Sequence, residues 1–181
     1  MTVLIRPQTA ADHDAVQALI GAAFGKPRAA RRRVPEVVLN EALHADPAFA
    51  PELTLVAELD RMIVGQVTSS YGVLVNPDPA VADRRLLAVG PVSVLPTHQH
   101  TGIGSIIMRR LVAAADAADE PAIVLLGSPD FYGRFGFVEA SEIAIEAPDP
   151  SWGKYFQARR LTAYDRGLVG RYRYAKPFAK L

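Results

Sequence analysis

Residues 92–110, VSVLPTHQHTGIGSIIMRR, decide how the middle of this 181-residue chain folds. An apolar run typical of a β-strand ends at Pro96, and a polar turn then leads into Gly102-Ile103-Gly104. An apolar pattern with helical spacing follows, and it contains no Pro or Gly as far as Glu120. The glycines permit a close approach of the backbone, and the first N–H groups of the helix have no partners of their own. Together with the positive end of the helix dipole, this order of strand, turn and helix predicts a cradle for a phosphate or pyrophosphate group.

Two familiar phosphate motifs are excluded by the residues around these glycines. A P-loop requires Gly-Lys-Ser/Thr, whereas Gly104 is followed by Ser105, and a dinucleotide-binding turn requires a small residue where Ile107 stands. The residues do match Gln-x-x-Gly-x-Gly at positions 99–104, preceded by Val-x-Val-x-Pro at positions 92–96. This string resembles the acyl-CoA-binding motif of the GNAT superfamily of N-acyltransferases, in particular its small bacterial members.

A second block of residues supports the same resemblance. Residues 122–126, AIVLL, predict a short buried parallel strand, and the string FYGRFGF follows at positions 131–137. The GNAT family commonly carries a Phe-Tyr…Gly-Phe signature on a short helix after its fifth strand, and the resemblance implies that Tyr132 protonates the departing CoA thiolate. A place for Tyr132 in ordinary aromatic core, beside Phe131 and Phe135, is the alternative.

The resemblance also implies that acetyl-CoA is the co-substrate and that one extended site binds it. Where a neighbouring strand splays away, free backbone groups can pair with the amides of the pantetheine arm, and a backbone N–H can stabilise the oxyanion. Gln99 is expected to hold the loop, and the histidines at 98 and 100 are expected to be exposed or to contact phosphate. The cofactor-binding residues implied in this way are Val92, Ser93, Val94, Gln99, His100, Thr101, Gly102, Ile103, Gly104, Ser105 and Phe131.

The base that acetyl transfer requires is not evident in the sequence. An alkylamine with a pKa of about 10.4 is mostly protonated at neutral pH, so a proton must be removed before it attacks. Relatives that use a carboxylate carry it on the strand before the pyrophosphate loop, but residues 84–90, RRLLAVG, contain none. Glu36, Glu41 or a water relay is left for this role. The missing carboxylate also supports a second hypothesis, a non-catalytic acyl-CoA-binding or regulatory module on the same fold.

Composition excludes several other classes of function. The absence of cysteine excludes a thiol nucleophile and favours direct transfer, with an acyl-serine route left open. The sequence contains no His-x-x-x-His pair, so a metal site is not expected. A formal net charge of +1 gives no general attraction to nucleic acid, although the Arg-rich stretches at 26–33 and 171–174 keep that third hypothesis open. The first stretch is typical of a solvated loop, and it lies where the resemblance places the acceptor pocket, so a preference for an acidic acceptor is open. The second, Arg-Tyr-Arg-Tyr, is typical of a strand with one charged face.

The remaining patterns predict the order of the elements. A capping box at Thr9 opens a helix, and Gly65 and the pair Gly90-Pro91 each predict a bulge in a strand. Other expected elements are a helix at 35–44, a hairpin of strands 53–59 and 62–71, a strand at 85–95, a helix at 102–118, and late strands at 143–146 and 155–162. The expected fold is a single GNAT domain over residues 1–181, mixed α/β. Its central twisted, mostly antiparallel sheet has about seven strands, is splayed at the fourth and fifth, and is flanked by about four helices.

The sequence therefore predicts an N-acetyltransferase that moves the acetyl group of acetyl-CoA directly to a primary amine of a small-molecule, peptide or protein acceptor. The identity of the acceptor and the preferred acyl chain length stay open. No apolar run approaches the ~18 residues of a membrane span, so we expect a cytoplasmic protein without a membrane partner. An aromatic C-terminal strand would suit the edge of a homodimer.

Overall fold

One mixed sheet, with helices on both faces, forms the computed structural model, which describes residues 2–25 and 33–180. The helices are α1 (His13–Phe24), α2 (Pro35–His44), α3 (Ile103–Ala117) and α4 (Pro129–Tyr132). The strands are β1 (Leu4–Pro7), β2 (Leu55–Leu59), β3 (Met62–Val75), β4 (Arg84–Val94), β5 (Ala122–Leu126), β6 (Val138–Glu139), β7 (Ile145–Glu146), β8 (Phe156–Arg160) and β9 (Gly170–Arg173).

The sheet is mostly antiparallel, as expected, but it contains more strands than the sequence predicted. Its main order is β1-β2-β3-β4-β5-β8-β6, and β9 pairs with both β3 and β7. Only β4 with β5 and β7 with β9 run parallel. The additional strands are short: β6 and β7 have two residues each, too few to give a periodic pattern. The strand expected at 143–146 is correspondingly reduced to β7, after a 3-10 turn at Ala140–Ile143.

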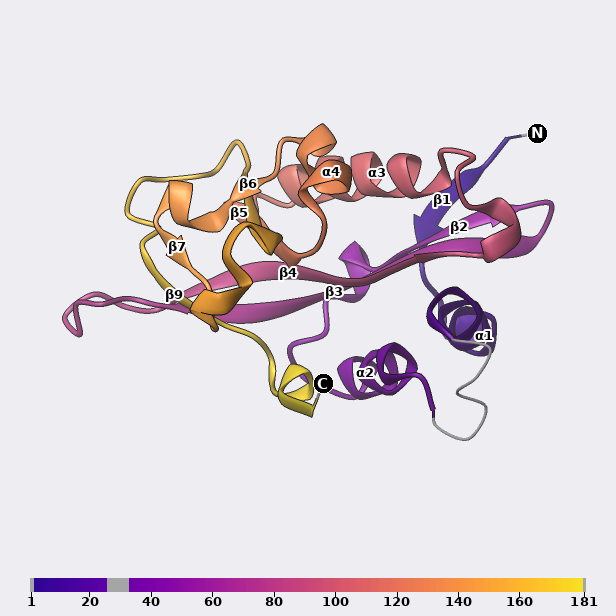
Figure 1. The fold of residues 1–181 in the computed structure, drawn as a ribbon, viewed down its shortest axis with the longest axis horizontal. Coiled ribbons are helices and arrows are strands. Elements are labelled where there is room, and N and C mark those ends of the chain that lie inside the picture. The colour runs from indigo at the N-terminus through magenta and orange to yellow at the C-terminus, as the bar shows by residue number, and fades with distance from the viewer. Residues whose placement is uncertain (1, 26–32, 181) are drawn as a thin grey trace.

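The helices form two layers around the sheet. In Figure 1, α3 and α4 lie on one face of the long β3–β4 ribbon, and α1 and α2 lie on the other. α3 buries an apolar stripe of Ile103, Ile107, Met108, Leu111 and Ala115. Gly65 on β3 allows this contact, because a Cβ there would lie 2.6 Å from Ile107 Cδ1. The register shift between β2 and β3 falls beside Gly65, which confirms the predicted bulge.

A second bulge opens the sheet next to α3. Val67 lies opposite Val92 while Ser69 lies opposite Val89, so β4 carries one extra residue at Gly90-Pro91, as predicted. β5 pairs with β4 only along Leu87–Val89. Within the described residues, no strand pairs with β4 at 92–94 on the side of β5, so the two strands diverge and leave that edge of β4 open.

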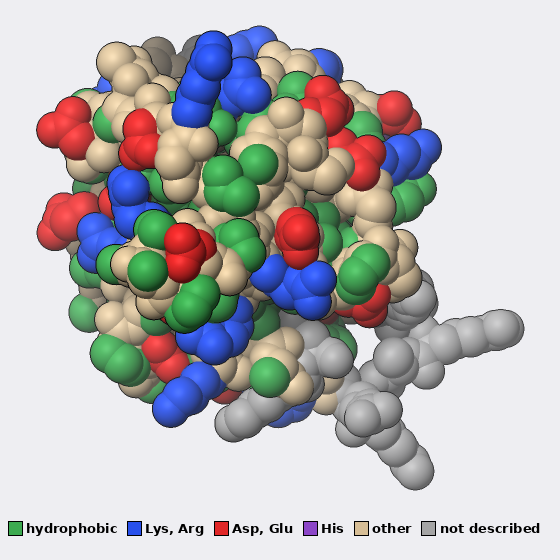
Figure 2. Space-filling view, turned by 90° about the vertical axis from the view of Figure 1, so that its left-hand side faces the viewer, with side chains coloured by type: hydrophobic (Ala, Val, Ile, Leu, Met, Phe, Trp, Pro, Cys, Tyr) green, Lys and Arg blue, Asp and Glu red, His purple; other side chains and the backbone are tan. Residues whose placement is uncertain are grey.

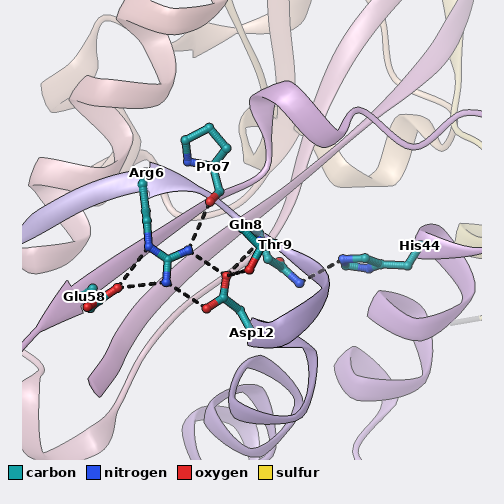
Figure 3. Close-up of polar contacts among 7 residues, drawn as sticks. All are labelled: Arg6, Pro7, Gln8, Thr9, Asp12, His44 and Glu58. Atoms are coloured by element: carbon teal, nitrogen blue, oxygen red, sulfur yellow. Dashed lines mark hydrogen bonds and ion pairs between the residues drawn. The ribbon is translucent and has the colours of Figure 1, made fainter. Parts of the chain in front are cut away.

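A partly buried ionic cluster fixes the start of α1 to the first two strands. The predicted capping box forms between Thr9 and Asp12, although a 3-10 turn at Ala10–Asp12 precedes the α-helix. Arg6 of β1 donates to both carboxylate oxygens of Asp12, at 2.7 and 2.8 Å, and to Glu58 of β2 (Figure 3). The hydrogen bonds from Arg6 hold the pKa of Asp12 well below its usual range.

The C-terminal strand does not offer the free edge that the sequence suggested for a dimer. β9 pairs with β3 through Arg171–Arg173 and with β7 through Gly170 and Arg171, so a strand lies on each side of it. The alternation of buried and exposed side chains along β9 is the expected one, with Tyr172 buried and Arg171 exposed in an ion pair with Glu146.

On the face shown in Figure 2, Lys and Arg side chains are interspersed with Asp and Glu, without a continuous patch of one sign. A homodimer stays a prediction, without β9 as its edge.

Candidate active site

A cavity of about 590 Å³ lies where β4 diverges from β5. It is formed by the end of β4, the loop that follows, the first turn of α3 and the short helix α4. Its lining residues are Val92, Ser93, Val94, His98, Gln99, His100, Gly102, Ile103, Gly104, Ser105, Phe131, Tyr132 and Arg134. The structure therefore brings together the two separate blocks of sequence in which the candidate site residues were expected.

The first turn of α3 presents unpaired backbone donors to this cavity. Gly102 adopts a left-handed conformation with φ of 91°, which turns the chain into the helix. The N–H of Ile106 donates to the Gly102 carbonyl, whereas Ile103, Gly104 and Ser105 precede the first hydrogen-bonded turn. Their N–H groups and the positive end of the helix dipole suit an anion.

The loop before the helix is held by its own side chains. Gln99 Nε2 donates to the Val94 carbonyl at 3.2 Å, which agrees with the supporting role expected of it. Thr101 Oγ1 donates to the His98 carbonyl at 2.6 Å. Thr101 was expected among the cofactor-binding residues, but its side chain does not line the cavity. Its place in the structure is that of a loop support.

Gly104 leaves the cavity open because it has no side chain. A Cβ at this position would lie 3.4 Å from Phe131 Cζ and 3.6 Å from Val94 Cγ2. Any longer side chain would extend from the helix between β4 and α4, where the cavity lies. A residue with bulk at position 104 would therefore fill the cavity without needing to unfold the helix.

Tyr132 reaches the cavity from α4, just beyond the end of β5. The N–H groups of Phe131 and Tyr132 both donate to the Ser128 carbonyl at 3.0 Å, and this bonding winds the chain into a single helical turn. The Tyr132 ring packs edge-on against Phe131, with centroids 4.9 Å apart. Gly127 makes room for it, since a Cβ there would lie 2.2 Å from Tyr132 Cε2. Burial raises the pKa of Tyr132 to about 12, so the phenol keeps its proton.

Two lining residues, Arg134 and His98, were not among the predicted cofactor-binding residues. The Arg134 guanidinium lies 4.8 Å from the centre of the Phe131 ring, and its Nε donates to the Phe131 carbonyl at 3.2 Å. Its position between two aromatic residues in FYGRFGF was the available signal, because such rings can hold a guanidinium over a site. The cavity lining contains Arg134, His98 and His100 and no carboxylate, which also suits an anionic ligand.

The two glutamates considered as bases lie outside the cavity lining. Glu41 of α2 forms an ion pair with Arg33, and neither Glu36 nor Glu41 lines the cavity. The basic run that was expected near the acceptor pocket falls largely on residues 26–32, which lie outside the described part of the chain. Among the residues that are described, no three His, Asp or Glu side chains are grouped to hold a metal ion.

A second cavity, of about 740 Å³, lies between α1 and the β2–β3 hairpin. Its charged lining includes Arg6, Asp12 and Glu58, which already pair with one another (Figure 3). Arg61 is the other charged residue of this lining. Because both carboxylates of the lining are already bound to Arg6, the cavity between β4 and β5 is the better candidate for chemistry.

Comparisons with known proteins identify the family. Residues 4–140 match the family described as Acetyltransferase (GNAT) domain. Among solved structures, the GNAT family N-acetyltransferase YhbS from Escherichia coli, in complex with CoA, is similar with a TM-score of 0.81 and 24% identity. That alignment covers 98% of this chain and 92% of the other. A GNAT family acetyltransferase from Brucella melitensis, in complex with acetyl-CoA, has a TM-score of 0.74 and 28% identity over 98% of both chains. No curated protein matches the sequence.

Within the described residues, no helix is long and apolar enough to cross a membrane.

The family match, the sheet opened between β4 and β5, and the cavity at that opening agree with one another. The chain belongs to the GNAT acetyltransferase family and is an acyltransferase of that family.

Proposed function

We propose that the chain, as a single domain of residues 1–181, transfers the acetyl group of acetyl-CoA directly to a primary amine, with Tyr132 as the general acid. The observation that carries this proposal is the continuous cavity that joins the first turn of α3, the open edge of β4 and the Tyr132 side chain. The anion-binding turn, the strand edge and the proton donor are the three parts that an acyl-CoA thioester requires. The acetyl-CoA complex of the similar Brucella protein supports acetyl-CoA as the donor.

The cofactor would be recognised largely by the main chain. Its pyrophosphate would receive hydrogen bonds from the N–H groups of residues 103–105, assisted by the positive charge of Arg134. The pantetheine arm would pair with β4 at residues 92–94, where β5 has left the strand edge open. This arrangement directs the thioester away from the helix and toward Tyr132.

We propose that the reaction proceeds without a covalent enzyme intermediate, since the chain has no cysteine to carry the acyl group. The lone pair of the neutral amine attacks the thioester carbonyl, the tetrahedral intermediate collapses, and the carbon–sulfur bond breaks. The leaving thiolate takes the Tyr132 proton, the new amide nitrogen loses its extra proton to water, and the Tyr132 phenolate regains a proton from water. The same dry surroundings that raise the pKa of Tyr132 disfavour a thiolate, so proton transfer accompanies bond cleavage.

We propose a water relay as the route for the proton of the amine. No carboxylate lines the described cavity, and Glu41 is occupied by Arg33. An acceptor without an enzymatic carboxylate must be deprotonated mainly by the solvent. The rate is therefore expected to rise with pH as the acceptor amine loses its proton.

The proposal is tested by calorimetric titration of acetyl-CoA into the wild type and into Gly104→Glu. Glutamate is tolerated in the first turn of a helix, so the variant is expected to fold while placing bulk and negative charge in the cavity. Ala80→Glu, in the exposed loop between β3 and β4, adds the same charge elsewhere and serves as the matched control. We expect micromolar binding by the wild type and Ala80→Glu and none by folded Gly104→Glu. Absence of binding to the wild type would refute the proposed function.

A further inference from the structure

A chain of buried polar side chains links the helices α1 and α2 to the bulge beside the cavity. Gln17 Nε2 of α1 donates to Asn40 Oδ1 of α2 at 2.9 Å, and Asn40 Nδ2 donates to Thr68 Oγ1 of β3 at 2.6 Å. Thr68 Oγ1 donates to Gln66 Oε1 at 3.0 Å. Gln66 Nε2 donates to the Pro91 carbonyl at 3.1 Å and to Ser93 Oγ at 2.9 Å. The middle members Asn40, Thr68 and Gln66 are fully buried, so none of these groups can turn to water instead.

The donor-to-acceptor direction of these hydrogen bonds follows from the last acceptor, the Pro91 carbonyl. A carbonyl oxygen can only accept, so Gln66 must present its Nε2 there and its Oε1 to Thr68. Thr68 must then donate to Gln66 and accept from the amide of Asn40. If the side-chain amide of Asn40 or Gln66 were turned over, two acceptors or two donors would face each other. Because these groups are buried, the unsatisfied pair would lower the stability of the fold.

The same argument fixes the role of the Ser93 hydroxyl. Since Gln66 offers Ser93 an N–H, the Ser93 oxygen accepts that bond and its own proton must point elsewhere. Ser93 makes no other side-chain hydrogen bond within the described structure, and it lines the cavity although it is only 5% exposed. The fixed network therefore leaves one hydroxyl proton for a ligand in the cavity.

The position of Ser93 indicates which part of a ligand would receive this proton. Val92 and Val94 pack against the core beneath α3, whereas Ser93 lies on the opposite face, with Gln66 and Thr68. In the proposed function the anionic end of the cofactor lies on the first turn of α3 and its pantetheine arm lies along β4 at residues 92–94, which brings the acyl carbonyl to the strand that carries Ser93. A carbonyl oxygen is an acceptor only, and the Ser93 hydroxyl offers a donor.

We propose that the Ser93 hydroxyl donates a hydrogen bond to the thioester carbonyl of the acyl-CoA, and that Gln66 is the residue that positions it. This inference rests on the proposed function and adds a side-chain donor for the oxyanion of the tetrahedral intermediate. Ser93 touches the reacting atoms, while Gln66 acts through Ser93 and through its bond to the Pro91 carbonyl at the bulge.

The test follows the ¹³C resonance of acetyl-CoA labelled at the acetyl carbonyl, because a donated hydrogen bond polarises the carbonyl and moves its resonance downfield. We expect the bound resonance to lie downfield of the free one in the wild type and in Ser93→Thr, which keeps the hydroxyl. In Ser93→Ala the shift is expected to be lost. Gln66→Glu should also lose it although Ser93 is present, since the carboxylate would accept the Ser93 proton. Ser70→Ala, which removes a buried serine outside the cavity lining, should leave the shift unchanged.

Calorimetry supplies the second measurement and separates the carbonyl from the rest of the cofactor. Loss of one neutral hydrogen bond should weaken acetyl-CoA binding to Ser93→Ala by about three- to tenfold, while CoA, which lacks the acetyl carbonyl, binds as to the wild type. Ser93→Cys, with a weak S–H donor, replaces Ser93→Ala if the latter does not fold.

Three outcomes would overturn the inference. An unchanged carbonyl resonance in Ser93→Ala would show that the hydroxyl does not reach the thioester. An equal loss of CoA and acetyl-CoA would assign the donor to an amide of the pantetheine arm. Failure of the wild type to bind either ligand would refute the proposed function itself, which distinguishes that failure from the first two.

Discussion

The position of the Tyr132 ring depends on the lack of a side chain at Gly127. Its ring fits where Gly127 has no Cβ, and it is flanked by Phe131 and by Phe137, whose ring centroid lies 6.0 Å away. The aromatic surroundings remove water and raise the pKa of the phenol to about 12. The aromatic surroundings thus keep the phenol protonated, as a general acid must be before it reacts, and Tyr132 also lines the cavity.

Replacement of Tyr132 by Phe should therefore affect turnover and not binding. We expect Tyr132→Phe to lower kcat about 10²-fold or more, since the ring remains and only the proton donor is lost. The affinity for acetyl-CoA should be unchanged by calorimetry. In the wild type the phenol stays protonated until the pH approaches its pKa, so Tyr132 should cause no alkaline decline of kcat at or below pH 10. An equal kcat in the wild type and in Tyr132→Phe would show that Tyr132 is not the general acid.

Gly127 should behave as a positioning residue for Tyr132. A methyl group at position 127 would overlap the ring, so Gly127→Ala is expected to displace it and to lower kcat by about tenfold or more while the protein stays folded. Gly133→Ala is the matched control, because a Cβ there meets nothing within 4 Å. Steady-state kinetics of CoA release and circular dichroism would check both variants. Similar losses in the two would show that the effect is not specific to the Tyr132 contact.

At the scale of elements, the start of α1 combines a helix cap with an ion pair. Asp12 accepts from the Thr9 N–H at 2.7 Å and the Thr9 hydroxyl at 2.8 Å while it also binds Arg6. The Asp12 side chain is only 10% exposed, so a neutral replacement leaves the partly buried Arg6 charge with fewer partners. β1, β2 and α1 are thus joined through one carboxylate and one guanidinium (Figure 3).

We expect Asp12→Asn to lower the free energy of unfolding by about 2–4 kcal/mol at pH 7. The pKa of Asp12 is depressed in the folded state, so its stabilising contribution is fully present above the unfolded value of about 3.9. It is lost as the pH falls toward the folded value. Urea titrations from pH 7 down to pH 3 should therefore show the difference between wild type and variant shrinking below about pH 4. Asp14→Asn, on the exposed side of the same helix, should show neither effect.

The long elements could be predicted from the sequence, and the short ones could not. Pro35–His44 and the helix that follows Gly102 each have a start signal, a proline in the first turn or a glycine turn, and an apolar stripe, so their bounds match the prediction closely. β6 and β7 form because β8 and β9 lie beside them, and two residues carry no pattern that reveals such neighbours. The bulge at Gly90-Pro91 was evident because a proline cannot donate within a sheet.

Some parts of the candidate site could be predicted from the sequence, and others could not. Glycines, a strand edge and a tyrosine at characteristic spacing indicate a site along one stretch of chain. The bonds from Asn40 to Thr68, from Thr68 to Gln66 and from Gln66 to Ser93 join residues up to 28 positions apart, and none of these side chains has an unusual local pattern. The pairing of β3 with β4 and the packing of α2 against the sheet bring them together, and neither could be read from a local pattern.

At the scale of the whole molecule, the cavity depends on both halves of the sheet. The end of β4, the loop after it and the first turn of α3 supply one wall, and α4 after β5 supplies the other. A ligand that bridges the two walls should oppose their separation. Binding to the folded state alone raises the free energy of unfolding by RT ln(1 + [L]/Kd), so the gain grows with the logarithm of the ligand concentration.

Acetyl-CoA at a hundredfold excess over its Kd should therefore stabilise the protein by about 2.7 kcal/mol. For a chain of this size, that corresponds to a rise in Tm of about 5–10 °C. Differential scanning fluorimetry would measure it, with Gly104→Glu as the variant that should show no rise. A Tm that acetyl-CoA leaves unchanged in the wild type would contradict the expected site.

The unpaired N–H groups at the start of α3 and along the edge of β4 have a practical consequence for mutagenesis. Truncation of a side chain leaves its backbone donor in place, so an alanine scan of residues 92–105 would under-report the importance of this stretch. Proline, which removes an N–H, or an amide-to-ester exchange at Ile103, Gly104 and Ser105 addresses those donors directly. By the same reasoning, recognition of the pyrophosphate at Ile103, Gly104 and Ser105 depends on the backbone more than on the side chains, so a change of acceptor would call for substitutions elsewhere on the surface.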